Sequence, residues 1–193
     1  MRIFGTVLCG GAGRRMGGVD KALLRLAGQP LVTHAQDRLE PQVERLALSA
    51  NGDPARLGFT GLPVLADPLG AGPLAGVLAA LDWAAPLGAD AVVSVPVDTP
   101  FLPGDLVPRL WLAGDGGLAV ARCGDRLHPT CALWPVALRE ALRSALAAGA
   151  FKVMAFAATH AAAEAPFPGG DPDPFLNLNT PEDLARAEAA LAR

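Results

Sequence analysis

The chain has 193 residues, of which 51% are hydrophobic and 18% charged, and this composition is typical of a globular protein rather than a disordered one. Its formal net charge is −3 and its Arg and Lys residues are scattered, so it lacks the basic patch of a nucleic-acid-binding protein. Acidic residues interrupt the most hydrophobic third, so no apolar stretch reaches the roughly 18 residues of a membrane span. We therefore expect one domain over residues 1–193, with no nucleic-acid partner and no membrane partner.

In the first half of the chain, short apolar runs alternate with helix-like segments. The runs predict strands at residues 3–9, 43–50, 63–66 and 91–97. Helical patterns lie between them at residues 30–39 and 74–83. Such alternation is typical of parallel strands joined by crossover helices, and it predicts an α/β fold. Ligands of such sheets bind beyond the carboxyl ends of the strands, so we expect the functional residues in the loops that follow them.

The second half predicts further helices and a hairpin. Helices are expected at residues 102–112, 135–148 and 181–191. The start of the last is the best marked, because Thr180 suits an N-cap, Pro181 suits the first helical position, and two acidic residues follow. Two apolar runs within residues 117–133 predict a hairpin whose strands are added to the edge of the sheet, and residues 166–174 predict a loop.

The three cysteines form no CxxC pair, and an odd set of this kind suits a reducing compartment better than a disulfide framework. We therefore expect a cytoplasmic protein. A zinc site made of Cys123, His128 and Cys131 is disfavoured, because it lacks a fourth ligand and the usual spacing.

A glycine-rich segment follows the first predicted strand, where residues 8–21 read LCGGAGRRMGGVDK. Its glycines allow backbone amides to approach an anion, and Arg14, Arg15 and Lys21 supply positive charge, so we expect a triphosphate ligand. Two common glycine motifs do not match. A GxGxxG pattern fails at its last position, Met16, and a P-loop requires Gly-Lys-Ser/Thr where this chain has Asp-Lys-Ala. An NAD-binding oxidoreductase is therefore disfavoured.

Lys21 is distinguished by composition, since 14 of the 16 basic residues are Arg and the other Lys is Lys152. A compact ammonium acts as a point charge against a phosphate in a tight loop, whereas a guanidinium is a wide planar fork. We interpret Lys21 as a phosphate ligand, and the alternative is a solvated surface lysine.

The segment at residues 8–34 resembles the signature of molybdenum cofactor guanylyltransferases, which open with LAGG, followed by RMGG, a DK pair and GxPL. Cys9 departs from that pattern, because the family commonly carries Ala there. This first block is shared in looser form by many sugar and alditol-phosphate nucleotidyltransferases. Later blocks narrow the resemblance and extend it over nearly the whole chain: SAN at 49–51, DPLGAGPLAG at 67–76, PVDTPFLP at 96–103, HPTCAL at 128–133 and NLNTPEDL at 177–184.

The resemblance implies a Rossmann-like nucleotidyltransferase fold, a three-layer α/β/α sandwich with a mostly parallel sheet. It also implies an activity, the transfer of GMP from GTP to the terminal phosphate of molybdopterin, with pyrophosphate as the product and Mg²⁺ as the cofactor. GTP and molybdopterin are then the substrates. Transient contacts with other molybdenum cofactor biosynthesis proteins and with acceptor molybdoenzymes are also expected.

The resemblance assigns site residues position by position. It implies a magnesium ligand at Asp98 and a phosphate-contacting lysine at Lys21. The positions that match the nucleotide-binding backbone and further nucleotide contacts are Leu8, Cys9, Gly10, Gly11, Asn51 and Asp67. To these we add Arg15, or its neighbour Arg14, as a catalytic positive charge. Asn179, just before the last predicted helix, is interpreted either as a ligand of the metal or of the pterin phosphate, or as part of a structural turn.

Asp98 is also marked without the resemblance, because it follows the apolar run at residues 91–97 and should stand at the carboxyl end of a strand. Mg²⁺ binds through one or two carboxylates together with water and substrate phosphate oxygens, so one well-placed Asp suffices. The alternative is an aspartate that caps a turn. The attacking phosphate monoester is largely ionised at neutral pH, so the reaction requires no general base.

Two other functions remain open. One is a cytidylyltransferase or another sugar or alditol-phosphate nucleotidyltransferase of the same fold, although LCGG follows the guanine-type LAGG rather than a shorter AAG pattern. The other is a nucleotide-sensing module without catalysis. The presence of both Lys21 and Asp98 disfavours sensing, which needs no metal at the α-phosphate.

Overall fold

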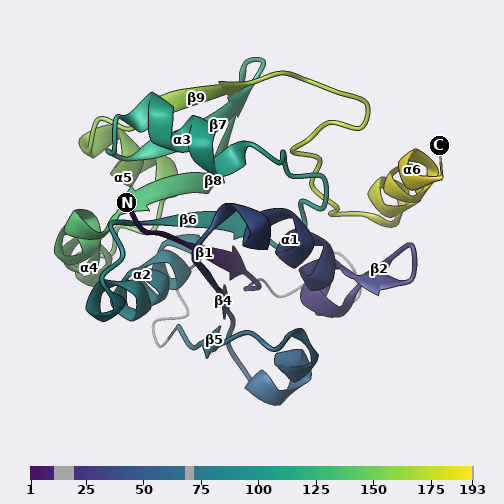
Figure 1. Ribbon diagram of the computed structural model, residues 1–193, viewed down its shortest axis with the longest axis horizontal. Coiled ribbons are helices and arrows are strands. Elements are labelled where there is room, and N and C mark those ends of the chain that lie inside the picture. The colour runs from purple at the N-terminus through teal and green to yellow at the C-terminus, as the bar shows by residue number, and fades with distance from the viewer. Residues whose placement is uncertain (11–19, 68–71, 193) are drawn as a thin grey trace.

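The computed structural model describes residues 1–10, 20–67 and 72–192, which fold around a seven-stranded sheet (Figure 1). The strand order is β5-β4-β1-β6-β8-β7-β9. These strands are β1 (Ile3–Leu8), β4 (Arg45–Ser49), β5 (Val64–Leu65), β6 (Ala91–Pro96), β7 (Ala119–Cys123), β8 (Arg126–Pro135) and β9 (Ala163–Phe167). A two-stranded sheet consists of β2 (Arg25–Leu26) and β3 (Gln29–Pro30).

The seven-stranded sheet is mostly parallel. β1 is parallel to both β4 and β6, and β5 is parallel to β4. β8 is antiparallel to β6 and β7, and β9 is parallel to β7. The carboxyl ends of β1, β4 and β6 therefore meet at one edge of the sheet, where α/β proteins bind their ligands.

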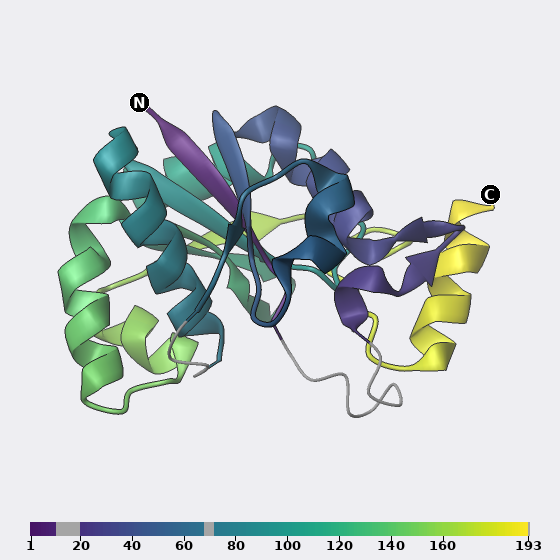
Figure 2. The same cartoon turned by 90° about the horizontal axis from the view of Figure 1, so that it is seen from below.

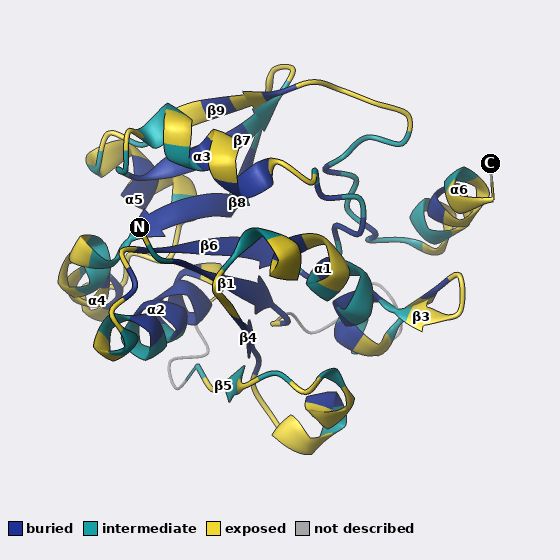
Figure 3. Cartoon of the chain, in the orientation of Figure 1, coloured by how far each residue is buried: buried dark blue, intermediate teal, exposed yellow. Residues whose placement is uncertain are grey.

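Helices cover both faces of the sheet (Figures 1 and 2). Side chains alternate between the faces along a strand, so β1 contributes Ile3 and Val7 to one hydrophobic cluster and Phe4 and Leu8 to the other. The first cluster includes residues of α1 (Leu31–Leu39) and α3 (Leu106–Gly114). The second includes residues of α2 (Pro73–Ala84), α4 (Arg139–Ala147) and α5 (Val153–Thr159). The central strands are buried between these layers, as Figure 3 shows. The expected three-layer α/β/α sandwich is confirmed.

The short helix η2 (Lys21–Leu23), the β2–β3 hairpin and the last helix α6 (Pro181–Leu191) gather on the side to which β1 points (Figures 1 and 2). The chain returns to the sheet just before α6, where the backbone amide of Leu178 donates to the carbonyl of Asp98 over 2.9 Å. Residues far apart in sequence are thus brought to the carboxyl end of β6. Among the helices described, none is long and apolar enough to cross a membrane.

The strands and helices expected in the first half are confirmed, with small shifts at their ends. The start of α6 is confirmed as well. The hydroxyl of Thr180 accepts the Asp183 amide, and the Asp183 carboxylate accepts the Thr180 amide, which completes a capping box.

Other expectations need correction. The hairpin strands β7 and β8 form, but they are not at the edge, because β9 pairs with the outer side of β7. Neither β9 nor α5 was expected, and β9 takes the first two residues of the expected loop. Pro166 is compatible with an edge strand, which needs no hydrogen-bond donor on its outer side. The third helix begins at Leu106 rather than Leu102, because a residue that precedes proline disfavours helical geometry.

Candidate active site

Asp98 lies immediately beyond the centre of the sheet. β6 is buried between β1 and β8, and its last residue is Pro96. The next amide, that of Val97, donates to the carbonyl of Leu8 over 3.2 Å, which ties the ends of β6 and β1 together. The carbonyl of Asp98 itself accepts the Leu178 amide. The backbone at Asp98 is therefore held from two sides.

Lys21 begins η2 and reaches the same point from the end of the glycine-rich segment. Asp20 caps this short helix by accepting the Ala22 amide at 3.0 Å, and the Ala22 side chain is fully buried. The Lys21 ammonium donates to Oδ2 of Asp98 at 2.8 Å and to Oδ1 of Asn179 at 2.6 Å. The structure thus brings together three residues that the sequence assigned to the site.

Asn179 is fixed by the N-terminus of α6. The Oδ2 atom of Asp183 accepts the backbone amides of both Asn179 and Thr180 at 3.0 Å. These bonds, the one from Asn179 first, favour the ionised carboxylate and lower the pKa of Asp183. The neighbouring Asn177 accepts a bond from the Thr99 hydroxyl at 3.2 Å, so a second amide lies close to the end of β6.

Within the described part of the chain, only one of the two carboxylate oxygens of Asp98 has a hydrogen-bond partner. Its Oδ2 accepts from Lys21, while its Oδ1 is buried and has no hydrogen-bond partner among the described residues. The side chains of Lys21 and Asp98 are 18% and 14% exposed. A buried carboxylate oxygen is a strong acceptor that requires a donor or a cation. A carboxylate oxygen of this kind is a ligand that suits a hard divalent cation.

The expected nucleotide-binding backbone lies next to this cluster. The amide of Cys9 donates to the carbonyl of Ser49 at 2.8 Å, so this amide is engaged in the sheet. Gly10 is exposed, and a Cβ added to it would meet nothing within 4 Å. Gly11, Arg14 and Arg15 lie outside the described residues.

Cys9 is buried, and its thiol donates to the carbonyl of Val7 at 3.6 Å. Burial first, and then the negative charge of Asp20, raise the pKa of Cys9 to about 12, against a smaller opposite effect of Arg56. Because the thiolate is the reactive form, this cysteine is not suited to act as a nucleophile.

Asn51 and Asp67 form a second group, after β4 and around the end of β5. The amide of Asp67 donates to Oδ1 of Asn51 at 2.9 Å. The chain that leaves β1 is bonded on one side to the end of β4, through the Cys9 amide and the Ser49 carbonyl, and on the other side to the residue after β6, through the Leu8 carbonyl and the Val97 amide. The Asn51–Asp67 group therefore lies on one side of this chain and the Lys21–Asp98 group on the other. A ligand lying along residues 8–10 would therefore meet Asn51 and Asp67 on one side and Lys21 and Asp98 on the other.

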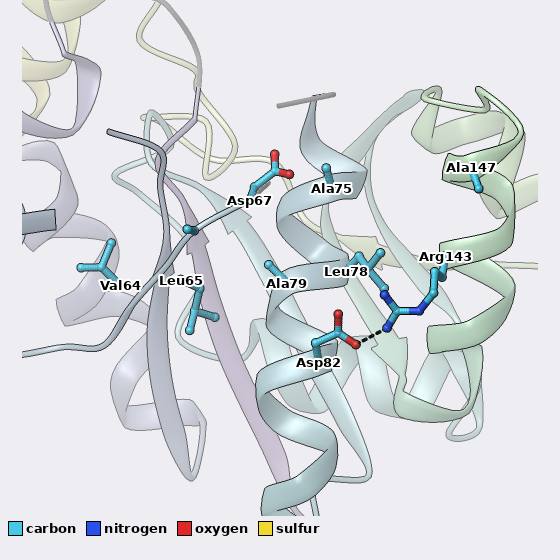
Figure 4. Close-up of a pocket in the computed structure, with 10 residues that line it drawn as sticks. Val64, Leu65, Asp67, Ala75, Leu78, Ala79, Asp82, Arg143 and Ala147 are labelled. Atoms are coloured by element: carbon cyan, nitrogen blue, oxygen red, sulfur yellow. Dashed lines mark hydrogen bonds and ion pairs between the residues drawn. The ribbon is translucent and has the colours of Figure 1, made fainter. Parts of the chain in front are cut away.

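A cavity of about 610 Å³ lies over α2, as Figure 4 shows. It is lined mainly by aliphatic side chains of β5, α2 and α4, and the Arg143–Asp82 ion pair lies across it with an N–O distance of 2.5 Å. Of the described residues expected to bind nucleotide, Asp67 alone lines it. Lys21 and Asp98 are not part of its lining.

Two structural contributors were missed by the sequence interpretation. Arg56 forms an ion pair with Asp20, its Nε lying 2.6 Å from Oδ2, and no sequence pattern marks Arg56. Gly76 allows α2 to approach the ends of β1 and β4, because a Cβ there would lie 2.6 Å from the Ser49 hydroxyl oxygen. The available sequence signal for Gly76 was its place as the last residue of the DPLGAGPLAG block.

His128 is buried and its ring stacks on Phe175 with a centroid distance of 4.4 Å. Burial, followed by the charge of Arg126, lowers the pKa of His128, so its neutral form is favoured. Trp134 is fully buried and donates to the Ser94 hydroxyl, so it is a residue of the core.

Comparison with known proteins identifies the family. The chain matches the model of the MobA-like NTP transferase domain over residues 5–163. It is 64% identical to a molybdenum cofactor guanylyltransferase of Cereibacter sphaeroides over 193 residues, which cover 100% of this chain and 99% of the relative. A molybdenum cofactor guanylyltransferase of Rhodopseudomonas palustris (strain BisB5) is 50% identical over 196 residues, covering 97% of this chain and 93% of the relative.

The fold is similar to that of a crystal structure of molybdopterin-guanine dinucleotide biosynthesis protein A from Archaeoglobus fulgidus. The TM-score is 0.77 and the identity 22%, with 98% of each chain covered, and at this identity the likeness supports the fold alone. The assignment to a family rests instead on the match to the family model and on the full-length identity to curated relatives. This chain belongs to the molybdenum cofactor guanylyltransferases, nucleotidyltransferases of the MobA-like NTP transferase family.

Proposed function

We propose that this enzyme transfers GMP from GTP to the terminal phosphate of molybdopterin, forming the molybdopterin guanine dinucleotide cofactor and releasing pyrophosphate. The observation that carries the proposal is the contact of the Lys21 ammonium with Asp98 and Asn179, beside the chain that leaves β1. We further propose that residues 1–193 act as a single nucleotidyltransferase domain.

In this reaction an oxygen of the pterin phosphate forms a bond to the α-phosphorus of GTP. The bond from that phosphorus to the oxygen bridging the α- and β-phosphates breaks, and pyrophosphate leaves with the electron pair. The attacking phosphate is largely ionised at neutral pH, so no residue has to remove a proton. The enzyme must instead hold two anions together and stabilise the charge that grows on pyrophosphate.

The proposed roles follow from charge and position. Lys21 supplies a point charge to the phosphates, and its contact with Asn179 directs the ammonium. Arg15, or Arg14, adds positive charge from the glycine-rich segment. The backbone of residues 8–11 binds the nucleotide. Asn51 and Asp67 contact it from the other side, and their amide and carboxylate groups can pair with the acceptor O6 and the N2 amino group of guanine.

The proposed cofactor is Mg²⁺, with Asp98 as its protein ligand and Asn179 as the second candidate. The buried, unpaired Oδ1 of Asp98 supports this assignment within the described residues, since Mg²⁺ requires only one or two protein carboxylates. When bound, Mg²⁺ offsets negative charge on the phosphates. Asp98 is in turn oriented by the ammonium of Lys21, which donates to its Oδ2.

A nucleotide panel tests the proposal. Purified enzyme is mixed with molybdopterin, Mg²⁺ and one of GTP, CTP, ATP or UTP, and the dinucleotide and pyrophosphate are quantified. We expect product with GTP well above the other three, and no product when the metal is chelated. Preferred use of CTP would move the chain to a cytidylyltransferase. Tight GTP binding with no pyrophosphate release would indicate a sensing module.

We also propose that the enzyme works in the cytoplasm, because Cys9, Cys123 and Cys131 are all free thiols and a reducing compartment suits them. There it would make transient contacts with other molybdenum cofactor biosynthesis proteins and with the acceptor molybdoenzymes. Crosslinking in cell extract, followed by identification of the captured proteins, tests this part.

A further inference from the structure

Asp20, the residue before Lys21, uses both of its carboxylate oxygens. Its Oδ1 accepts the Ala22 amide at 3.0 Å and thereby caps η2. Its Oδ2 accepts Nε of Arg56 at 2.6 Å. The first bond is local, whereas the second joins residues 36 positions apart. The capping group of the turn that carries Lys21 is therefore itself held by a distant side chain.

Arg56 is fixed in its own segment. It belongs to η4 (Pro54–Thr60), a short helix capped by Asp53, whose Oδ1 accepts the Ala55 amide at 2.9 Å. The Nη1 atom of Arg56 donates to the carbonyl of Asp53 at 3.2 Å, and the next residue, Leu57, is fully buried in the core. The Arg56 guanidinium that binds Asp20 is thus held by a turn that is anchored in the core.

The Arg56–Asp20 pair is more enclosed than the other arginine ion pairs of the described chain. Its two side chains are 25% and 27% exposed, compared with 44% and 51% for Arg109 and Asp105. Both Asp20 and Arg56 also affect the pKa of the buried Cys9 thiol, which agrees with a position of the pair beside the end of β1. Partial burial weakens screening by solvent, so this pair holds its geometry better than an exposed one.

We propose that Arg56 is a positioning residue for Lys21, acting through Asp20. The ion pair fixes η2, and η2 directs the Lys21 ammonium to Asp98 and Asn179. Ordering a lysine side chain costs substantial rotamer entropy. A fixed η2 limits the directions in which the Lys21 side chain can point, and it therefore lowers this cost. The inference rests on the proposed function of the site, in which Lys21 contacts the phosphates.

The test is a double-mutant cycle with Arg56→Gln and Lys21→Ala, measured both as turnover and as affinity for GTP with Mg²⁺ by calorimetry. In the wild-type background, Arg56→Gln should lower kcat by about tenfold, as expected when a charged group is misplaced by a fraction of an ångström. In the Lys21→Ala background, the same substitution should change neither quantity further, because Arg56 acts through Lys21. Additive effects would overturn the inference, since they would mean that Arg56 contacts the ligand or acts independently.

Two further variants separate positioning from general stability. Arg56→Lys preserves the charge toward Asp20 and should recover most of the lost turnover, whereas no recovery would contradict a role through the ion pair. Arg109→Gln removes a more exposed Nε–carboxylate pair at the start of α3, away from the site, and should leave turnover unchanged. The melting temperature of Arg56→Gln should fall by less than about 4 °C, because a partly exposed ion pair contributes little stability.

The outcomes distinguish this inference from the proposed function. If the wild-type enzyme fails to transfer GMP to molybdopterin, the proposed function is wrong, yet the cycle in GTP affinity still decides the role of Arg56. If the wild-type enzyme is active and Arg56→Gln matches it in turnover and affinity, the positioning inference alone is wrong.

Discussion

The Lys21 ammonium lies 2.8 Å from Oδ2 of Asp98, although the two residues are 77 positions apart. This ion pair joins the end of the glycine-rich segment to the end of the central strand β6. Because both side chains are largely buried, removal of either partner leaves the other as a poorly solvated, unpaired ion. The pair is therefore the most sensitive point of the candidate site.

Lys21→Arg tests the demand for a compact cation. The ammonium contacts two oxygens at 2.8 and 2.6 Å, and a longer planar guanidinium has to displace at least one of them. We expect turnover to fall by about a hundredfold while the melting temperature stays near that of the wild type. The matched control is Lys152→Arg at an exposed position, which should behave as the wild type. Unchanged turnover of Lys21→Arg would remove Lys21 from the site.

Asp98→Asn tests the assigned metal ligand. The amide keeps the shape and one acceptor oxygen but loses the negative charge that a hard cation requires. We expect metal-dependent transfer to be abolished, and stability to fall by about 1 kcal/mol because Lys21 keeps a neutral acceptor. Turnover is measured over a titration of Mg²⁺.

The control for Asp98→Asn is Asp90→Asn. Asp90 lies just before β6 and accepts the Arg2 amide, so the same chemical change is made at the other end of the strand. This variant should keep its Mg²⁺ dependence. Near-normal transfer by Asp98→Asn, with an unaltered Mg²⁺ dependence, would show that the metal binds elsewhere.

Asp183 predicts a pH dependence of stability. Its pKa is lowered, first by the Asn179 amide, so the folded state favours the ionised carboxylate. The resulting stabilisation is fully present above about pH 4, the ordinary pKa of an aspartate, and is lost as the pH falls through the lower folded pKa. Asp183→Asn should therefore make the free energy of unfolding fall less steeply below pH 4, and it should lower that free energy by about 0.5–1 kcal/mol at pH 7.

Urea unfolding of Asp183→Asn at pH 7 and at pH 3 makes this comparison. Glu182→Gln is the control, because it removes an exposed carboxylate from the same helical turn. If the two variants show the same pH dependence, the capping box does not hold Asn179 through the charge of Asp183.

Gly76→Ala tests the close approach of α2 to the sheet. The added Cβ would lie 2.6 Å from the Ser49 hydroxyl oxygen and 3.0 Å from Cδ2 of Leu8. We expect a loss of about 1–3 kcal/mol in thermal or urea unfolding, because overpacking shifts buried neighbours. Ser49→Ala should recover part of the loss in the double variant. Gly58→Ala, where nothing lies within 4 Å of the new methyl group, should cost little, and an equal cost at both glycines would contradict the packing argument.

Much of the fold could be predicted from local pattern. The apolar runs marked β1, β4 and β6, because a strand buried on both faces reads as a continuous hydrophobic segment, and a shorter apolar run marked the edge strand β5. The start of α6 was predicted down to its cap, since Thr180, Pro181 and Asp183 act within a single turn. Asp98 was placed correctly after a strand for the same reason, because the signal lies in the residues directly before it.

The order of the outer strands could not be predicted in this way. β9 contains Pro166 and pairs with β7, more than 40 positions earlier in the chain. Strand pairing between such distant segments is chosen by the packing of whole layers, and the local sequence of β9 resembles a loop. The hairpin was therefore placed at an edge that β9 occupies.

The sequence by itself marked Lys21, Asp98 and Asn179 as candidate site residues, because each lies in a recognisable local pattern. Only the tertiary structure decided how they meet. The contact of Lys21 with Asn179 spans 158 positions and that of Arg56 with Asp20 spans 36, and both depend on where η2, η4 and α6 are held around the end of the sheet. A hydrogen bond requires donor and acceptor to lie about 3 Å apart, and packing around the sheet alone brings segments this distant in sequence to that range.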